Sequence, residues 1–516
     1  MNVLNAIEQH AIQKPEAIAL FGSNHSLSYA QLASRVKICA DNISRMGIKR
    51  LGLLMDNCPD WVVIDLACIQ VGVTLTPMPH FFSQVQLQNL CRSANIDHIA
   101  TNFLSLTKSL DISTEQLTEP LAGHPVFRTV TGACQSSTPN PVPAKITFTS
   151  GTTGDPKGVC LGQSTLDGVA HTIKEQLSSL DLKIHLCVLP MSTLLENVAG
   201  VYGTLMNGGC CHLPSLEEIG FSSSSGFNPA RLISALGRYQ PNSMILVPEL
   251  LAALVALVEA GDKIPDSIRF IAVGGAHVPR QLLSRAAALD IPVYEGYGLS
   301  ECGSVVSLNH PKSHKTGSVG KPLSGTKIRI ADSGEIIVSG RAYSHYLGQR
   351  ASPEDKQQEI HTGDIGYLDS NGYLYITGRL KNLIITSFGR NLSPEWIESE
   401  LTASPNIDQC AVFADNKPFC SALIIPHWGQ DQLSGVEQAI EQANRKLPEY
   451  AQIKKWVMLS EPFTPENGML AVNGQLLREC ISQHHAKSIA SMYAHEPYPA
   501  RLKAIALSST AHYSAN

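Results

Sequence analysis

Residues 146–159 read Ile146-Thr147-Phe148-Thr149-Ser150-Gly151-Thr152-Thr153-Gly154-Asp155-Pro156-Lys157-Gly158-Val159, an apolar, β-prone lead-in followed by hydroxyls, glycines and a lysine. The backbone N–H groups of such a loop can form a nest that binds an anion, with hydroxyl donors and one cation beside it. Pro156 before Lys157 and Gly158 after it exclude a Walker A loop, which requires G-K-[ST]. A flexible turn with a surface lysine is the alternative, because such turns are common. We interpret the stretch as a phosphate-binding loop.

The composition indicates a globular protein of the cytoplasm. The chain has 516 residues, enough for more than one domain, with 43% hydrophobic and 16% charged residues. The net charge of −5 gives no general reason to expect nucleic acid as a partner. The 13 cysteines form no C-x-x-C pair, which favours buried reduced thiols. We expect no signal peptide, because no basic flank precedes an apolar core, and no transmembrane segment, because Leu250 to Ala260 is too short.

Strands alternate with helices along the first part of the chain. Helical spacing predicts a helix over 27–45, a buried strand follows at 51–55, and Asp56 to Pro59 can cap the next helix. Further strands are expected at 73–75 and 98–100, with a helix between them. Residues 103–143 carry few periodic signals and are interpreted as a connector. This alternation predicts βαβ units and mostly parallel sheets, whose ligands lie beyond the carboxyl ends of the strands.

Two later strands each run into a glycine-bearing turn. The strand at 268–273 leads into Gly274-Gly275-Ala276, where bare backbone lets a flat ligand approach, although an ordinary tight turn is the alternative. The strand at 291–294 ends in Glu295-Gly296-Tyr297-Gly298-Leu299-Ser300-Glu301. A dinucleotide fingerprint is excluded there, because Glu301 stands where the third glycine belongs.

Three more motifs follow in order: Gly317 to Pro322, His361-Thr362-Gly363-Asp364-Ile365-Gly366-Tyr367, and Gly378-Arg379-Leu380-Lys381. Together with the phosphate loop and the Tyr297 motif, they closely resemble the adenylate-forming (AMP-binding) superfamily. That superfamily includes acyl-CoA synthetases, the adenylation domains of peptide synthetases and firefly luciferase. The resemblance is nearest to acyl-CoA synthetases of the long-chain fatty acid–CoA ligase type, and it extends to about Arg478.

The resemblance implies an α/β fold. It comprises a large N-terminal domain of mostly parallel sheets with a β-rich subdomain, and a small mobile α+β C-terminal domain. We expect the first domain over 1–378 and the second over 379–484, with Lys381 as the hinge between them. Residues 485–516 are expected to be a tail of unknown role, because they lie beyond the usual end of the family.

The resemblance also implies ATP, Mg²⁺ and coenzyme A as partners, and it gives each motif a role. Glu301 would bind Mg²⁺, Ser300 would touch the α-phosphate, and Tyr297 with Gly298 would lie against adenine. Asp364 would accept the ribose hydroxyls and Arg379 would reach the same ribose, although Asp364 taken alone reads as a turn aspartate. Lys157 and Gln475 join Glu301 as the catalytic candidates. The remaining binding candidates are Thr149, Ser150, Gly151, Thr152, Thr153 and Gly154 for phosphate, and Gly274, Gly275 and Ala276 for the other face of adenine.

The resemblance implies an ATP-dependent ligase that makes an acyl-AMP and passes its acyl group to CoA. A medium- or long-chain fatty acid is favoured over an amino acid, because few charged residues, Glu196, Glu295, Arg280 and Arg285 among them, could meet an amino group. Two alternatives stay open. One is an acyl-AMP former that loads the phosphopantetheine of a carrier protein or another acceptor. The other is an adenylation-impaired binding protein, since Gln475 stands where the family has a lysine.

Overall fold

The computed structural model describes residues 2–110, 114–129, 142–149, 157–221, 226–340, 345–348, 359–382, 384–385, 391–415, 417–427, 432–470 and 476–494. Two large sheets carry the N-terminal part of the chain. Both have parallel strands at their centres and antiparallel strands at their edges. This confirms the α/β architecture with mostly parallel sheets that the alternation of strands and helices predicts.

The first sheet has nine strands among the described residues, in the order β16-β15-β14-β13-β12-β10-β11-β1-β2. Its strands are β16 (Lys321–Pro322), β15 (Ser307–Leu308), β14 (Val293–Tyr297), β13 (Phe270–Val273), β12 (Ser243–Leu246), β10 (Ile184–Leu186), β11 (Cys210–Leu213), β1 (Ile18–Gly22) and β2 (Ser26–Ser28). The carboxyl ends of β13 and β14 run into the two glycine-bearing turns, so both turns lie at one edge of this sheet.

The second sheet has eight strands in the part of the chain described, in the order β19-β9-β8-β4-β3-β5-β7-β6. Its strands are β19 (His345–Tyr346), β9 (Lys157–Leu161), β8 (Lys145–Thr149), β4 (Thr74–Pro77), β3 (Arg50–Leu54), β5 (His98–Thr101), β7 (Val126–Thr129) and β6 (Thr114–Gln116). The antiparallel pair β8 and β9 flanks the phosphate loop, with Thr149 opposite Lys157.

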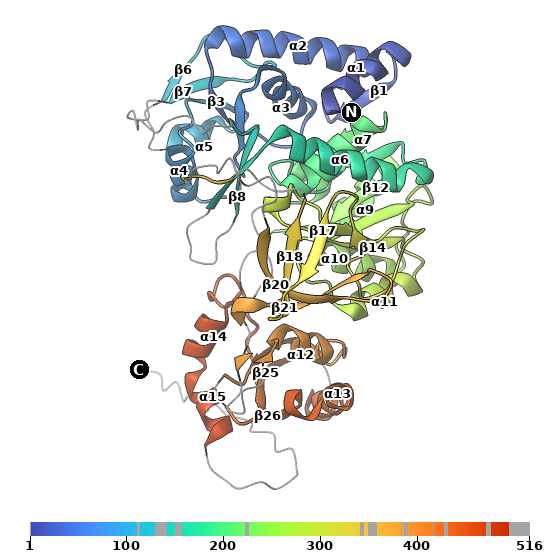
Figure 1. The fold of residues 1–516 in the computed structure, drawn as a ribbon, viewed down its shortest axis with the longest axis vertical. Helices are drawn as coiled ribbons and strands as arrows, with labels where there is room; N and C mark the ends of the chain where they lie inside the picture. The colour runs from blue at the N-terminus through green and yellow to red at the C-terminus, as the bar shows by residue number, and fades with distance from the viewer. Residues whose placement is uncertain are drawn as a thin grey trace, which may run out of the picture.

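Helices cover and separate these sheets (Figure 1). They are α1 (Val3–Gln13), α2 (Tyr29–Met46), α3 (Pro59–Val71), α4 (Gln84–Ser93), α5 (Leu104–Ser109), α6 (Gln163–Leu177), η1 (Ser178–Leu180), η2 (Leu195–Tyr202), α7 (Gly203–Met206), α8 (Leu216–Ile219), α9 (Pro229–Tyr239), α10 (Pro248–Glu259), α11 (Arg280–Ala288) and η3 (Ser300–Cys302). A capping box of Ser28 and Gln31 begins α2, and Gly47 ends it in the left-handed conformation. No helix of the described chain combines the length and the apolarity that crossing a membrane requires.

A buried polar network joins the two halves of the N-terminal core. The Lys145 ammonium lies 2.9 Å from Asp65 Oδ1, and both side chains are almost completely buried. Asn197 Nδ2 and the Tyr202 hydroxyl donate to Asp65 Oδ2 at 2.9 and 2.7 Å. The Lys145 ammonium also donates to Asn197 Oδ1. Because Lys145 begins β8 while Asn197 and Tyr202 belong to η2, the network ties the strand before the phosphate loop to η2.

The rest of the chain forms a β-rich layer and then a C-terminal lobe, drawn gold to red in Figure 1. The layer is a sheet of β17 (Lys327–Ile330), β18 (Glu335–Ser339), β20 (Ile360–Leu368) and β21 (Leu374–Arg379). The lobe contains η4 (Leu380–Asn382), β22 (Ile384–Ile385), β23 (Asn391–Leu392), α12 (Pro394–Leu401), β24 (Ile407–Phe413), β25 (Cys420–Pro426), α13 (Gln432–Lys446), η5 (Glu449–Ala451), β26 (Ile453–Met458), α14 (Arg478–His484) and α15 (Ala486–Tyr493).

Three local expectations differ from the structure. The expected connector over 103–143 contains α5, β6 and β7; these elements are too short to show a hydrophobic period. Within the expected cap Asp56 to Pro59, Cys58 is the N-cap of α3 and Pro59 its first residue, but no side chain of this described stretch makes a capping hydrogen bond. Asp56 Oδ1 instead accepts from the backbone N–H groups of Asn57 and Leu216 at 2.7 and 3.2 Å. The expected tail from residue 485 begins with α15, where Met492 is fully buried and the Tyr493 hydroxyl donates to the Phe413 carbonyl at 2.8 Å.

Candidate active site

The structure brings three predicted nucleotide-binding residues into contact. The Tyr297 hydroxyl donates to Asp364 Oδ2 at 2.5 Å, and Arg379 Nε lies 2.7 Å from Asp364 Oδ1. Asp364 and Arg379 are opposite each other in the β20–β21 ladder, and Tyr297 ends β14. Burial raises the pKa of Asp364, while the Arg379 guanidinium and the Tyr297 hydroxyl oppose that rise. The geometry places a buried carboxylate where the glycine-bearing turn of β14 meets the β-rich layer.

Glu301 lies in η3, which follows β14 of the first sheet and contacts β9 of the second sheet. Strand β9 begins at Lys157. The Tyr346 hydroxyl of β19 donates to Glu301 Oε1 at 2.8 Å, and β19 pairs with β9. Glu301 is half-buried and offers hard carboxylate oxygens, so its chemistry fits a magnesium ion. Lys157 is exposed at the end of the phosphate loop.

Several predicted residues lie outside the described part of the chain. They are Ser150, Gly151, Thr152, Thr153 and Gly154 of the phosphate loop, and Gln475. The backbone of Thr149 is described as the last residue of β8. These assignments therefore stay predictions.

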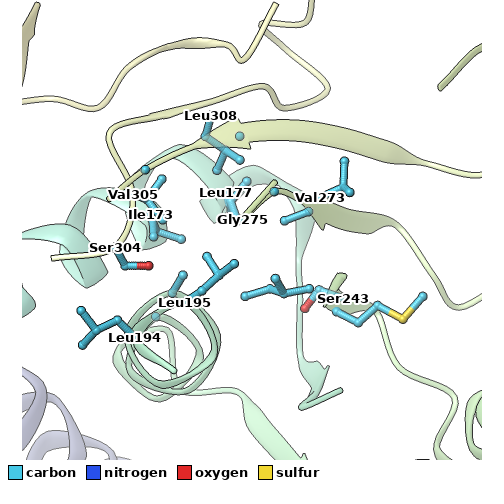
Figure 2. A pocket seen from close by; sticks show the side chains of 18 of the residues that line it. Ile173, Leu177, Leu194, Leu195, Ser243, Val273, Gly275, Ser304, Val305 and Leu308 are labelled. Atoms are coloured by element: carbon cyan, nitrogen blue, oxygen red, sulfur yellow. The ribbon is translucent and has the colours of Figure 1, made fainter. Parts of the chain in front are cut away.

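An apolar cavity of about 310 Å³ extends from this site along the face of the nine-stranded sheet. Gly274, Gly275, Gly296, Gly298 and Ser300 line its near end; Ala276 lies in the same turn but is not part of the lining. A side chain at position 298 would overlap the Ser304 carbonyl, so only glycine fits there. The opposite wall is formed by α6 and η2, through residues such as Ile173, Leu177 and Leu195 (Figure 2).

A buried polar pair lies at the cavity wall, where His185 is one of the lining residues. His185 Nε2 and Glu196 Oε1 are 2.8 Å apart, and the Leu189 N–H donates to Glu196 Oε2 at 2.9 Å. The π-helical turn of η2 brings Glu196 inward, and a Cβ at Gly200 would collide with both partners. Glu196 is therefore already paired. Arg285 forms an ion pair with Glu259 on the surface. Neither residue is placed to meet an amino group of a substrate in the cavity.

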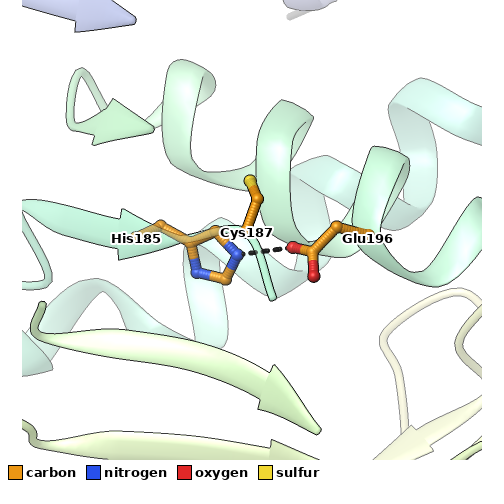
Figure 3. A group of neighbouring side chains, drawn as sticks. All are labelled: His185, Cys187 and Glu196. Carbon is orange, nitrogen blue, oxygen red and sulfur yellow. Dashed lines mark hydrogen bonds and ion pairs between the residues drawn. The ribbon is translucent and has the colours of Figure 1, made fainter. Parts of the chain in front are cut away.

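His185, Cys187 and Glu196 could be read as metal ligands, since their ligand atoms lie within 4.8 Å of one another (Figure 3). Burial raises the pKa of the Cys187 thiol well above its ordinary value, and the negative charge of Glu196 adds to that rise. A metal requires the thiolate, and Glu196 has both oxygens hydrogen-bonded. We therefore interpret the group as hydrogen-bonded packing that supports the cavity wall.

Sequence reasoning missed Ser304, His185 and Tyr346. Ser304 lies three residues past Glu301, and His185 is an unexpected polar residue in a buried strand. Both could have been noticed as polar residues inside apolar runs. Tyr346 has no such local signal, because its contact with Glu301 depends on the pairing of β19 with β9.

Comparison with known proteins gives the class of this chain. The family model of AMP-binding enzymes matches residues 7–343, and that of the AMP-binding enzyme C-terminal domain matches residues 381–497. The chain therefore belongs to the AMP-binding enzymes, the adenylate-forming superfamily that its motifs resemble. It is an AMP-forming acid–thiol ligase, the class to which its curated relatives also belong.

Two curated relatives illustrate the range of that class. The chain is 25% identical to the long-chain-fatty-acid–CoA ligase FadD15 of Mycobacterium bovis, covering 96% of this chain and 97% of that protein. It is 28% identical to the 2-succinylbenzoate–CoA ligase of Bacillus licheniformis, covering 79% of this chain and 86% of that protein.

A solved structure confirms the fold. The anthranilate CoA ligase AuaEII in complex with anthranoyl-AMP is 17% identical, with a TM-score of 0.75, over 95% of this chain and 98% of that chain.

Proposed function

We propose that this enzyme activates a hydrophobic carboxylic acid, with a medium-chain fatty acid as the first candidate, and transfers its acyl group to coenzyme A. The apolar cavity carries this proposal. It reaches along β13 from Val273 to Phe270, three strand residues or about 10 Å from the nucleotide motif. Half-exposed Lys174 and exposed Asn207 border its far end, where a longer chain could emerge. Reduced cysteines throughout the described chain agree with a cytoplasmic location.

The chemistry proceeds in two displacements. A carboxylate oxygen of the acid attacks the α-phosphorus of ATP and pyrophosphate leaves; the thiol sulfur of CoA then attacks the acyl carbon and AMP leaves. The barrier of the first displacement is largely charge repulsion, so preorganised donors and cations lower it. In our proposal the phosphate loop with Lys157 holds the pyrophosphate end, Glu301 holds Mg²⁺, which would neutralise phosphate charge, and Ser300 contacts the α-phosphate. Tyr297, Asp364 and Arg379 hold the nucleoside.

A screen of acid-dependent ATP–pyrophosphate exchange tests this function directly. The screen covers saturated fatty acids of increasing length, aromatic acids including 2-succinylbenzoate, and amino acids. We expect exchange with medium-chain acids and none with amino acids. Thioester assays with CoA and with a phosphopantetheine-bearing carrier protein then identify the acceptor. Exchange driven by an amino acid alone would show the proposed substrate class to be wrong.

Asp364→Ala is expected to weaken ATP binding by about 1.5–3 kcal/mol, which is roughly 10- to 100-fold in Kd. A carboxylate offers about four lone-pair positions, and Tyr297 and Arg379 occupy two of them. The remaining positions can accept the ribose hydroxyls. Calorimetric titration with ATP measures the effect. The control is Asp369→Ala, which removes an aspartate at the other end of the same hairpin, where it binds Lys315. Equal ATP affinity in the two variants would exclude Asp364 from the site.

The junction at Lys381 is expected to be the hinge of a mobile C-terminal domain. Lys381 lies exposed in η4, and the contacts across the junction include the Ser393 hydroxyl donating to the Thr377 carbonyl at 2.6 Å. Limited proteolysis should cut near residue 381 in the free protein, and the rate of cutting should change when ATP or acyl-AMP is bound. Cutting that occurs mainly elsewhere, with no ligand dependence at this junction, would contradict the hinge. A Lys381→Pro variant, which restricts the backbone there, should slow the second displacement more than the first.

A further inference from the structure

Ser243 and Ser304 face the largely apolar cavity from opposite sides (Figure 2). Ser243 Oγ lies 3.1 Å from His185 Nδ1, so its hydrogen bond is made within the protein. Ser304 Oγ differs: it is buried and has no hydrogen-bond partner among the residues that the structure describes. The whole Ser304 residue is only 9% exposed.

The backbone of Ser304 is strained. Its φ of 109° falls in a region that side chains with a Cβ rarely adopt. The Ser304 N–H donates to the Leu299 carbonyl at 3.2 Å, and the Ser304 carbonyl packs against Gly298. The nucleotide motif thus holds this backbone in place and directs the hydroxyl into the cavity. Ser304 therefore lies at the end of the cavity that adjoins the nucleotide motif.

A buried hydroxyl without a partner is unfavourable, and so is a serine at positive φ. Glycine at this position would remove both costs and alanine would remove the first, yet the chain has serine. A ligand oxygen in the cavity would supply the missing partner. The remaining lining near Ser304, with Val305 and Leu194, is apolar and matches hydrocarbon.

We infer that Ser304 Oγ hydrogen-bonds an oxygen substituent on C3 of the substrate, close to its carboxylate. The inference rests on the proposed function and narrows it: the acid is a 3-hydroxy or 3-oxo acid with a hydrocarbon remainder, rather than an unsubstituted fatty acid. Ser304 is then a specificity-determining residue, because an acid without that oxygen leaves the hydroxyl unpaired.

Calorimetric binding of two acyl-sulfamoyl adenosines tests this without turnover; one carries octanoyl and the other 3-hydroxyoctanoyl. Wild-type protein should bind the hydroxy analogue about tenfold more tightly. In Ser304→Ala this ratio should fall to near one, mainly through weaker binding of the hydroxy analogue. The control Thr76→Val removes another buried hydroxyl without a partner in the described chain, at a position outside the cavity lining, and should keep the wild-type ratio.

The outcomes separate the inference from the proposed function. If wild-type protein bound neither analogue, the proposed function would fail and this inference with it. If it bound both equally well, only the inference would be overturned. If Ser304→Ala weakened both analogues by the same factor, Ser304 would contact the acyl-phosphate mimic instead, which also overturns the inference.

Stability gives a second readout. Ser304→Ala keeps the backbone strain and removes only the unpaired hydroxyl, so the urea midpoint of the ligand-free protein should be equal to or above that of wild type. A lowered midpoint would mean that the hydroxyl has a partner within the protein, and the inference would be wrong.

Discussion

Gln475→Lys is expected to raise acid-dependent ATP–pyrophosphate exchange at least several-fold. In the family that the chain resembles, a lysine at this position reaches the carboxylate and the α-phosphate during adenylation. Glutamine can donate a hydrogen bond, but it brings no positive charge to a transition state crowded with negative oxygens. Loss of a comparable preorganised donor costs about 10²–10³ in rate, and the neutral donor retained here should reduce that cost.

The residues on either side of position 475 suit such a role. Leu470 and Leu476 pair as an isolated antiparallel bridge, and both Nη atoms of Arg478 bind Glu398, at 2.6 and 2.5 Å. This buried ion pair fixes the start of α14 two residues after Leu476. The scaffold that would present a lysine is therefore built in this chain.

The test compares two displacements in three proteins: wild type, Gln475→Lys and Gln475→Leu. Exchange should rise with lysine and fall with leucine, which removes the remaining donor. Thioester formation from presynthesised acyl-AMP should be nearly the same in all three, because the family uses this lysine in adenylation. A wild-type protein that already exchanges at the rate of the lysine variant would show that another cation fills this role.

Lys145→Met is expected to lower the free energy of unfolding by about 3–5 kcal/mol, because it leaves the Asp65 carboxylate buried without its counter-charge. The two side chains are 1% and 0% exposed, so water cannot replace the lost partner. Urea unfolding followed by tryptophan fluorescence measures the change; Trp61 lies 5.7 Å from the Lys145 ammonium and reports on this region. Since Lys145 begins the strand that ends at Thr149, phosphate binding should weaken as well.

Two variants make the stability result specific. Lys183→Met breaks an exposed pair with Asp181, whose side chains are 74% and 64% exposed, and should cost at most about 1 kcal/mol. The double variant Lys145→Met with Asp65→Leu removes both buried charges and should recover much of the lost stability. If Lys145→Met unfolds at the same urea concentration as Lys183→Met, the buried network contributes little.

The local sequence was sufficient to predict the class of fold and to locate the motifs. The alternation of short apolar strands with amphipathic helices repeats within windows of a few residues, and β3, β4, β5 and α2 appear close to where the period places them. The resemblance of the motifs to the family pointed to Tyr297, Asp364 and Arg379, although Asp364 alone reads as a turn aspartate, and the three side chains lie in contact. Periodic elements and short motifs depend on residues that are close together in the sequence, so they can be recognised from the sequence alone.

Only the tertiary structure decided what surrounds those residues. Lys145 and Asp65 are 80 positions apart in the sequence, and each alone reads as an ordinary charged residue. The same holds for β6 and β7, whose few residues become strands by pairing at a sheet edge, and for α15, which is ordered by packing on the C-terminal lobe. In the sequence Ser304 is an ordinary loop serine, and its hydroxyl is buried only because α6, η2 and the sheet pack around it. Burial, an unmet hydrogen bond and the shape of a cavity arise from contacts between distant segments, and no local pattern of residues specifies them.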